Sequence, residues 1–329
     1  MDLPRLAPLA PVFLQKVWAA PGLAGPLGPA LAAPPATGEV WLASDRHAVT
    51  PVAAGPWEGL GLDEVVRRWP EYVTGQARPA GFPLLVKILA VGQWLSVQVH
   101  PDDQAARRLE GEPWGKSEAW HVLAAGPAAQ IIHGLAPGVG RAEVAQAAAQ
   151  GRLPAVLARV PARPGDTFHL PAGTLHATGP DLLIFEIQQA SDVTYRFYDW
   201  DRPGDDGRLR PLHLERALAV LQASGPGRPT LPRAVAPPPA ACRLLVTDRH
   251  FSLLAWDLAG PAAAGPDRLA RVLFVLAGEG RLAGRDGPWR QAAPGGAWLV
   301  PAGAGGWQAE PGPEGLVLLE SLAVAPPAA

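Results

Sequence analysis

The sequence has little cysteine and no long apolar run, and each scarcity excludes a class of protein. A single cysteine, Cys242, excludes an internal disulfide framework and is typical of a reducing compartment. No uninterrupted apolar stretch is long enough to span a bilayer, and the first residues do not combine a basic region with an apolar core. We therefore expect a soluble, cytoplasmic protein with no membrane partner.

The sequence also lacks an excess of charge of one sign. Its 28 basic and 30 acidic residues offer no strongly basic face to nucleic acid, so any phosphate-binding site must use local charges. A phosphate-cradling glycine loop, a nucleophilic serine motif and paired-cysteine metal motifs are absent too. What remains is a chain of 329 residues, 48% hydrophobic, which can bury the core of one large domain or two smaller ones.

Lysine is scarce as well, with only Lys16, Lys87 and Lys116, while arginine supplies the other basic residues. Arginine presents a planar fork of donors and lysine a compact ammonium, so the two are not interchangeable at a binding site. We therefore expect the lysines to lie where a compact ammonium is needed. Two of them fall within residues 81–134, which also contain the strongest motif in the chain.

That motif is the sequence WLSVQVHPDD, which starts at Trp94. Its alternation predicts a strand over residues 94–100, in which side chains two apart share a face, so Gln98 and His100 point the same way. An imidazole nitrogen and an amide oxygen presented together suit a borderline cation such as zinc. Glu118, at the start of the next apolar run, would add a carboxylate from a neighbouring strand.

A second motif, GDTFHLPAGTLH, covers residues 165–176. It predicts a turn, a short strand, a tight turn from Pro171 to Gly173 and a returning histidine, His176. A glycine, five residues, Pro-x-Gly, two residues and a histidine form the second metal motif of cupin barrels. The C-terminal residues 295–307 repeat this pattern with a glycine in place of the histidine, which indicates a degenerate second cupin.

Taken together, the two metal motifs resemble those of the type I phosphomannose isomerases in their short bacterial form. The resemblance continues through EIQQ at residues 186–189 and TYRFYDWDR at residues 194–202, and it covers nearly the whole chain. It implies a mainly β protein. We expect a cupin jelly-roll barrel with helical insertions over residues 1–240, followed by a smaller, metal-free cupin-like domain over residues 241–329.

The resemblance also implies a function in mannose metabolism, as a metal-dependent aldose–ketose isomerase that interconverts mannose 6-phosphate and fructose 6-phosphate through an enediolate. This reaction needs a Lewis acid, a base and an anchor for the phosphate. The implied ligands of one zinc ion per chain are Gln98, His100, Glu118 and His176. Such ligands also accept manganese, iron or cobalt.

Five further residues are assigned to the site. The resemblance places Lys87 and Ser96 at the sugar phosphate, and Lys116 in the active site, where it might otherwise only pair with Glu118 on the rim. Arg196 can hold a phosphate or enediolate oxygen in fork geometry. Glu186 is either the catalytic base or a carboxylate that only orients a ligand or an arginine, because burial raises a carboxyl pKa and a nearby dication lowers it.

Two other functions stay open. One is a different metal-dependent cupin enzyme such as an iron dioxygenase, against which Lys87 and Arg196 argue, because an oxygenase of apolar substrates does not need two buried cations. The other is a non-catalytic sugar-phosphate-binding or regulatory cupin. We expect a monomer or a small homo-oligomer.

Outside the motifs, the pattern of apolar residues predicts helices within residues 62–69, 141–159 and 212–221. Lys87 lies in the almost wholly apolar residues 83–89, which predict a buried strand in which a lysine either reaches the strand end or meets an anion in a cavity. We expect the second. Residues 223–241 are dense in proline and glycine and predict a linker.

Overall fold

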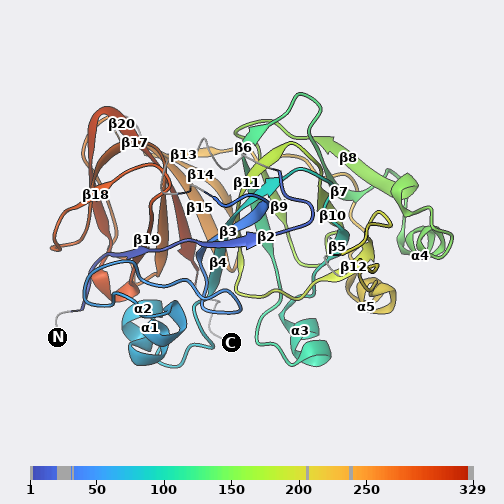
Figure 1. Ribbon diagram of the computed structural model, residues 1–329, viewed down its shortest axis with the longest axis horizontal. Helices are drawn as coiled ribbons and strands as arrows, with labels where there is room; N and C mark the ends of the chain where they lie inside the picture. Colours follow the sequence, from blue (N-terminus) through green and yellow to red (C-terminus); the bar gives the residue numbers. More distant parts are fainter. Residues whose placement is uncertain (1–2, 21–30, 32, 205–206, 237–239, 325–329) are drawn as a thin grey trace.

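The structure is a computed structural model that describes residues 3–20, 31, 33–204, 207–236 and 240–324 (Figure 1). Its strands form three antiparallel sheets, of six, five and nine strands. In Figure 1 the nine-stranded sheet lies on the left and the other two lie together on the right. The predicted mainly β fold is confirmed.

The six-stranded and five-stranded sheets carry the two sequence motifs. The six-stranded sheet has the order β2 (Val12–Gln15), β3 (Thr37–Ala43), β4 (Leu84–Val91), β11 (Leu182–Gln189), β6 (Glu118–Ala125) and β9 (Thr167–Leu170). The five-stranded sheet has the order β12 (Tyr195–Tyr198), β5 (Val97–Val99), β10 (His176–Thr178), β7 (Gln130–Leu135) and β8 (Leu157–Pro161). Strands β3, β4 and β11 are buried along their whole length, as central strands covered on both faces should be.

The nine-stranded sheet is built mainly from the C-terminal part of the chain. Its order is β1 (Ala7–Leu9), β19 (Ala297–Val300), β17 (Arg271–Gly284), β20 (Trp307–Ala323), β15 (Phe251–Leu258), β14 (Ala240–Thr247) and β13 (Arg233–Ala236), with β16 (Ala262–Ala264) on β20 and β18 (Arg290–Ala292) on β17. It therefore takes in β1 and β13 from before residue 241. The domain division at residue 240 stays a prediction.

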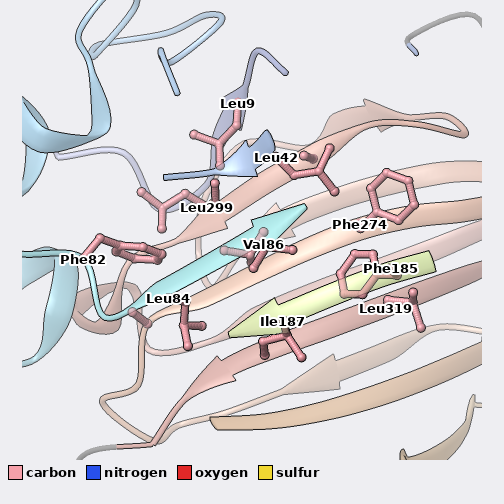
Figure 2. Close-up of a cluster of buried hydrophobic side chains, with 14 of the residues drawn as sticks. Leu9, Leu42, Phe82, Leu84, Val86, Phe185, Ile187, Phe274, Leu299 and Leu319 are labelled. Atoms are coloured by element: carbon pink, nitrogen blue, oxygen red, sulfur yellow. The ribbon is translucent and has the colours of Figure 1, made fainter. Parts of the chain in front are cut away.

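One hydrophobic core joins the six-stranded sheet to the nine-stranded sheet. Figure 2 shows Val86 and Phe185 from the first sheet among Phe274, Leu299 and Leu319 from the second. The ring centroids of Phe185 and Phe274 lie 5.6 Å apart. The two sheets thus share the apolar contacts that hold them together.

Side chains along the central strand β11 alternate between the shared hydrophobic core and the opposite face of the sheet. In β11, Leu183, Phe185 and Ile187 lie in the shared core, whereas Leu182 and Ile184 pack into a separate cluster on the other side. Because successive side chains of a strand point to opposite faces, the even-numbered residues of β11 face away from the shared core. This places Glu186 in the interior of the N-terminal sheets.

The helices lie outside the sheets, and they are α1 (Leu62–Arg68), α2 (Pro70–Thr74), α3 (Asp103–Glu110), α4 (Arg141–Ala149) and α5 (Leu214–Val220), with short 3₁₀ turns η3 (Leu153–Val156) and η4 (Ala302–Ala304). The predictions for residues 62–69 and 212–221 are confirmed. For residues 141–159 the prediction is right up to η3 and wrong beyond it, because β8 begins there and pairs with β7. No helix in the described part of the chain is both long and apolar enough for a membrane span.

Three segments differ from the predictions. The strand expected over residues 94–100 is shorter, since only β5 forms ladder pairs there. Helix α3 was not predicted; it begins after Asp102, whose carboxylate accepts a hydrogen bond from Ala105 N at 2.8 Å. The linker is also shorter than expected, because β13 and the start of β14 fall within residues 223–241. Of that segment, residues 237–239 lie outside the described residues.

Candidate active site

Three of the four predicted metal ligands form one buried cluster between the two N-terminal sheets. Ligand atoms of His100, Glu118 and His176 all lie within 4.8 Å of one another. His176 Nε2 lies 3.1 Å from Glu118 Oε1, and His100 Nε2 lies 3.6 Å from Glu118 Oε2. The fourth predicted ligand, Gln98, faces the same point, with its Nε2 at 3.4 Å and 3.3 Å from the two histidine Nε2 atoms.

Strand pairing brings these residues together. His176, the first residue of β10, is paired in register with Gln98 in β5, and His100 directly follows β5. Glu118 is the first residue of β6 in the other sheet. The turn before His176 is tied to the same place, because Gly173 N donates to His100 O at 2.8 Å.

Each histidine is oriented by a backbone carbonyl. His100 Nδ1 lies 2.8 Å from Val193 O, and His176 Nδ1 lies 2.9 Å from Thr174 O. A carbonyl can only accept, so both Nδ1 atoms carry a proton, and a neutral ring in this orientation presents its Nε2 lone pair to the cluster. Burial, reinforced by the Lys116 ammonium, lowers the pKa of His100 well below its usual range, and the neutral ring is the form that binds a metal.

The donor set fits a divalent cation. His176 Nε2 and the carboxylate oxygen Glu118 Oε1 face each other at 3.1 Å inside the cluster. Within the described part of the chain, no hydrogen-bond donor is assigned to the buried Glu118 Oε1. A divalent cation bound between two imidazole nitrogens and this carboxylate would satisfy all three groups. Turning the Gln98 amide about its last bond would exchange its nitrogen and oxygen and present the oxygen to the same point.

Lys116 lies within the buried cluster and not on its rim. Its side chain is 4% exposed, and Nζ contacts Glu118, lies 3.3 Å from His100 Nε2 and lies 3.5 Å from Glu186 Oε1. Burial alone would raise the pKa of Glu118, but the Lys116 ammonium holds that pKa well below its usual range. The carboxylate is therefore ionised and available as a ligand.

A cavity of about 160 Å³ opens beside the cluster. Six of the nine predicted site residues line it, namely Lys87, Ser96, Gln98, Lys116, Glu186 and Arg196. All three lysines of the chain line it, since Lys16 is also part of the wall. The scarcity of lysine in the sequence therefore marked this cavity.

Lys87 meets an anion within the cavity. Its Nζ lies 3.1 Å from Glu186 Oε2, and its side chain is 7% exposed. Burial opposes the charge of Lys87, but Glu186 and Glu39 outweigh it and raise the pKa of Lys87 above its ordinary value. Its neighbour on the wall, Ser96, donates from Oγ to Gln98 Oε1 at 3.1 Å. Ser96 thus touches a predicted metal ligand as well as the cavity.

Glu186 is a buried carboxyl group beside two ammonium groups. It accepts a hydrogen bond from Trp120 Nε1 at 3.3 Å, in addition to its contacts with Lys87 and Lys116. Burial raises the pKa of Glu186, Lys87 partly offsets this, and the Glu118 carboxylate adds to the rise. A carboxyl with a raised pKa that faces a cavity is suited to exchange protons with a ligand.

Arg196 supplies a guanidinium to the wall. Its buried Nε has no hydrogen-bond partner among the residues that the structure describes, whereas Arg210 beside it is held by both oxygens of Asp199 at 2.6 Å. Burial and the neighbouring Arg210 lower the pKa of Arg196, although a guanidinium stays charged at neutral pH. Arg196 is therefore free to donate to an oxyanion in the cavity.

Sequence reasoning missed two acidic residues of the wall, Glu39 and Asp192. Glu39, in β3, accepts from Trp41 Nε1 at 2.7 Å and lies 3.5 Å from Lys16 Nζ. No motif distinguishes these acids. The only available signal was the isolated charge of Glu39 within an otherwise apolar strand.

Comparison with known proteins identifies the family of this chain. Residues 6–116 match the family model of the phosphomannose isomerase type I catalytic domain. The mannose-6-phosphate isomerase of Streptococcus mutans is 37% identical over 278 residues, which cover 83% of this chain and 86% of that protein. The chain belongs to the type I phosphomannose isomerases. In the same family, mannose-6-phosphate isomerase ManA of Bacillus subtilis is 35% identical over 274 residues, covering 83% of this chain and 85% of that protein.

Solved structures of the family have the same fold. The mannose 6-phosphate isomerase of Bacillus subtilis superimposes with a TM-score of 0.87 at 30% identity, over 96% of this chain and 99% of that chain. A zinc-bound mannose 6-phosphate isomerase gives a TM-score of 0.79 at 17% identity, over 98% of this chain and 100% of that chain. At the second identity the likeness shows the fold alone.

Proposed function

We propose that this chain interconverts mannose 6-phosphate and fructose 6-phosphate, with one zinc ion held by Gln98, His100, Glu118 and His176. One observation carries the proposal. His100, Glu118 and His176 form a buried cluster, with His176 Nε2 3.1 Å from Glu118 Oε1, beside a cavity that all three lysines line. Relatives that bear the name mannose-6-phosphate isomerase support this choice of substrate.

A bound ion would polarise the substrate oxygens and stabilise the negative charge that develops on them. Two imidazoles, a carboxylate and an amide oxygen suit zinc. The iron dioxygenase alternative gains no support, because the cavity presents several cations to its ligand. The cytoplasmic location and the assembly as a monomer or small homo-oligomer stay predictions.

The isomerisation moves a proton between adjacent carbons, and we assign that transfer to Glu186. Its raised pKa makes its carboxylate a stronger base than an exposed glutamate. Lys87, 3.1 Å away, and Trp120 hold the carboxylate in place. Lys116 and Arg196, on the same cavity wall, would donate to the substrate oxygens at the reacting end.

Lys87 and Ser96 are assigned to the phosphate. An ammonium and a hydroxyl are both good donors to phosphate oxygens. Because Lys87 also pairs with Glu186, a phosphate beside Lys87 would draw charge away from that ion pair and raise the pKa of Glu186 further. Binding of the phosphate would thus strengthen the base that the reaction uses.

The test is a coupled assay of the zinc-loaded protein with mannose 6-phosphate, in which formation of fructose 6-phosphate is followed with and without a chelator. We expect turnover that the chelator abolishes and that added zinc restores. Tight binding of mannose 6-phosphate without turnover, with metal present, would contradict the proposal and favour a sugar-phosphate-binding cupin.

A further inference from the structure

The segment that carries Lys116 and Glu118 is held from outside the cavity. Gly115 N donates to Asp103 Oδ1 at 2.8 Å, and Ser117 N donates to Gln189 Oε1 at 2.9 Å. Gln189 Nε2 in turn donates to Asp103 Oδ1 at 2.9 Å. One carboxylate and one amide, bonded to each other, thus hold the two backbone N–H groups on either side of Lys116.

Asp103 and Gln189 link α3, β11 and the segment just before β6, which meet at the site. Asp103 is the first residue of α3, and Gln189 is the last residue of β11, the strand that carries Glu186. Gln189 N also donates to Ser117 O at 3.1 Å, so Gln189 and Ser117 are bonded through both backbone and side chain. Ser117 Oγ accepts from Ala172 N at 3.1 Å, which connects the network to the turn before His176.

Neither Asp103 nor Gln189 lies on the substrate side. Both line a separate cavity of about 310 Å³, which shares no lining residue with the cavity beside the metal cluster. A substitution at either position therefore leaves the substrate cavity wall chemically unchanged. Any effect on metal or substrate must therefore pass through the backbone, and the segment of residues 115–118 is the one that both side chains hold directly.

The site requires that segment to be placed accurately. Lys116 Nζ contacts Glu118 and lies 3.3 Å from His100 Nε2 and 3.5 Å from Glu186 Oε1. A displacement of about 1 Å would change which of these groups Lys116 Nζ contacts. Misplacements of that size can lower the reaction rate by up to about a hundredfold. Glu118, two residues along, would move with it.

We propose that Asp103 and Gln189 are positioning residues that hold Lys116 and Glu118 in the geometry needed for metal binding and for the isomerisation. The kinetic part rests on the proposed function; the metal-binding part does not. Asp103 is ionised in this role: burial opposes the charge, but the bonds from Gly115 and Gln189 lower its pKa. Hydrogen bonds to an ionised acceptor are stronger than neutral ones.

The test compares donor and acceptor patterns at the two positions. Asp103→Ala removes the acceptor, whereas Asp103→Asn keeps an oxygen in place. Gln189→Glu sets two carboxylates against each other, and the double variant Asp103→Asn with Gln189→Glu restores the match, because the asparagine amide can donate to the new carboxylate. The control is Asp63→Ala, which removes an exposed carboxylate in the first turn of α1 that makes no hydrogen bond to any residue the structure describes.

The zinc dissociation constant, measured by chelator competition, and the values of kcat and KM are the readouts. Asp103→Ala and Gln189→Glu should each raise the dissociation constant about tenfold and lower kcat about tenfold, with KM changed by less than about threefold. Asp103→Asn and the double variant should stay within about threefold of the wild type in both quantities. Asp63→Ala should match the wild type.

Three results would overturn the proposal. One is a loss of thermal stability in Asp103→Ala with metal affinity and kcat unchanged, which would show a purely structural role. Another is a double variant no better than Gln189→Glu alone. The third is an equal effect of the control. If the wild-type protein binds zinc but does not turn over mannose 6-phosphate, the proposed function fails, while the series of zinc affinities still decides whether the two residues position Glu118.

Discussion

Burial sets the chemistry of individual residues at this site. Within a few ångströms it helps to keep His100 neutral and raises the pKa of Glu186, while neighbouring positive charge keeps Glu118 ionised. Glu118 and Glu186, two carboxyl groups that would behave alike on the surface, thereby have pKa values shifted in opposite directions. The predicted roles of ligand and base depend on these differences.

Removal of either histidine of the cluster should remove metal and activity together. His100→Ala or His176→Ala takes away a nitrogen ligand from a buried site whose other donors cannot reach around the gap. We expect less than about a tenth of the wild-type metal content and rate. Metal analysis of the purified variants checks this. His169→Ala is the control, because His169 pairs with Asp248 at 3.2 Å and lies outside the cluster; full metal content in either cluster variant would contradict the ligand assignment.

His121 should make the protein less stable in mild acid. Burial, with a contribution from Arg243, lowers the pKa of His121 from 6.5 to about 4. Between these values the unfolded chain binds a proton that the folded chain does not, so stability falls as the pH falls. The loss from this residue between pH 7 and pH 5 should be about 2 kcal/mol.

The variant His121→Asn keeps a group that can bond to Thr167 but cannot take up the proton. Denaturant unfolding at the two pH values should show a smaller difference for this variant than for the wild type. The control His47→Asn, at an exposed position, should leave the difference in unfolding free energy between the two pH values unchanged. An undiminished difference in His121→Asn would exclude His121 as the source.

Strand register decides which residues of different elements meet. Lys87 in β4 and Glu186 in β11 are directly paired across the sheet, which explains their ion pair. A shift of one residue in this register would turn Lys87 into the shared hydrophobic core. Apolar residues alternate on both strands, and their burial in the core excludes that shift. The same register that buries the core therefore also pairs Lys87 with Glu186.

The first turn of α3 should depend on its cap. Asp102 Oδ1 accepts from Ala105 N at 2.8 Å, so Asp102→Ala leaves a helix N–H without a partner and should cost about 1 kcal/mol of unfolding free energy. Asp102→Asn keeps an acceptor and should cost much less. Chemical denaturation measures both. Equal stability of the two variants would show that the cap contributes nothing.

The whole molecule should unfold as one unit. The six-stranded and nine-stranded sheets share the core of Figure 2, so neither can expose its inner face without the other. Phe185→Ala removes a fully buried ring that lies against Phe274 and should cost about 3–5 kcal/mol. The result should be a single calorimetric transition at a lower temperature.

Phe185→Leu is the matched control, because it keeps most of the apolar volume and should lose much less stability. Two separate transitions, of which the substitution moves only one, would contradict the shared core. That outcome would instead support two independently stable domains with the division at residue 240.

Sequence alone determined the mainly β class, the shared face of Gln98 and His100, and the assignment of two of the three lysines, Lys87 and Lys116, to one site. These features follow from the two-residue period of a strand and from residue chemistry, which are local. Only the tertiary structure decided that Glu39 and Asp192 join the cavity wall, that β1 and β13 join the C-terminal sheet, and that Asp103 and Gln189 hold the segment around Lys116. Those contacts join residues far apart in the chain, and they depend on strand register and packing between sheets, which a local pattern does not contain.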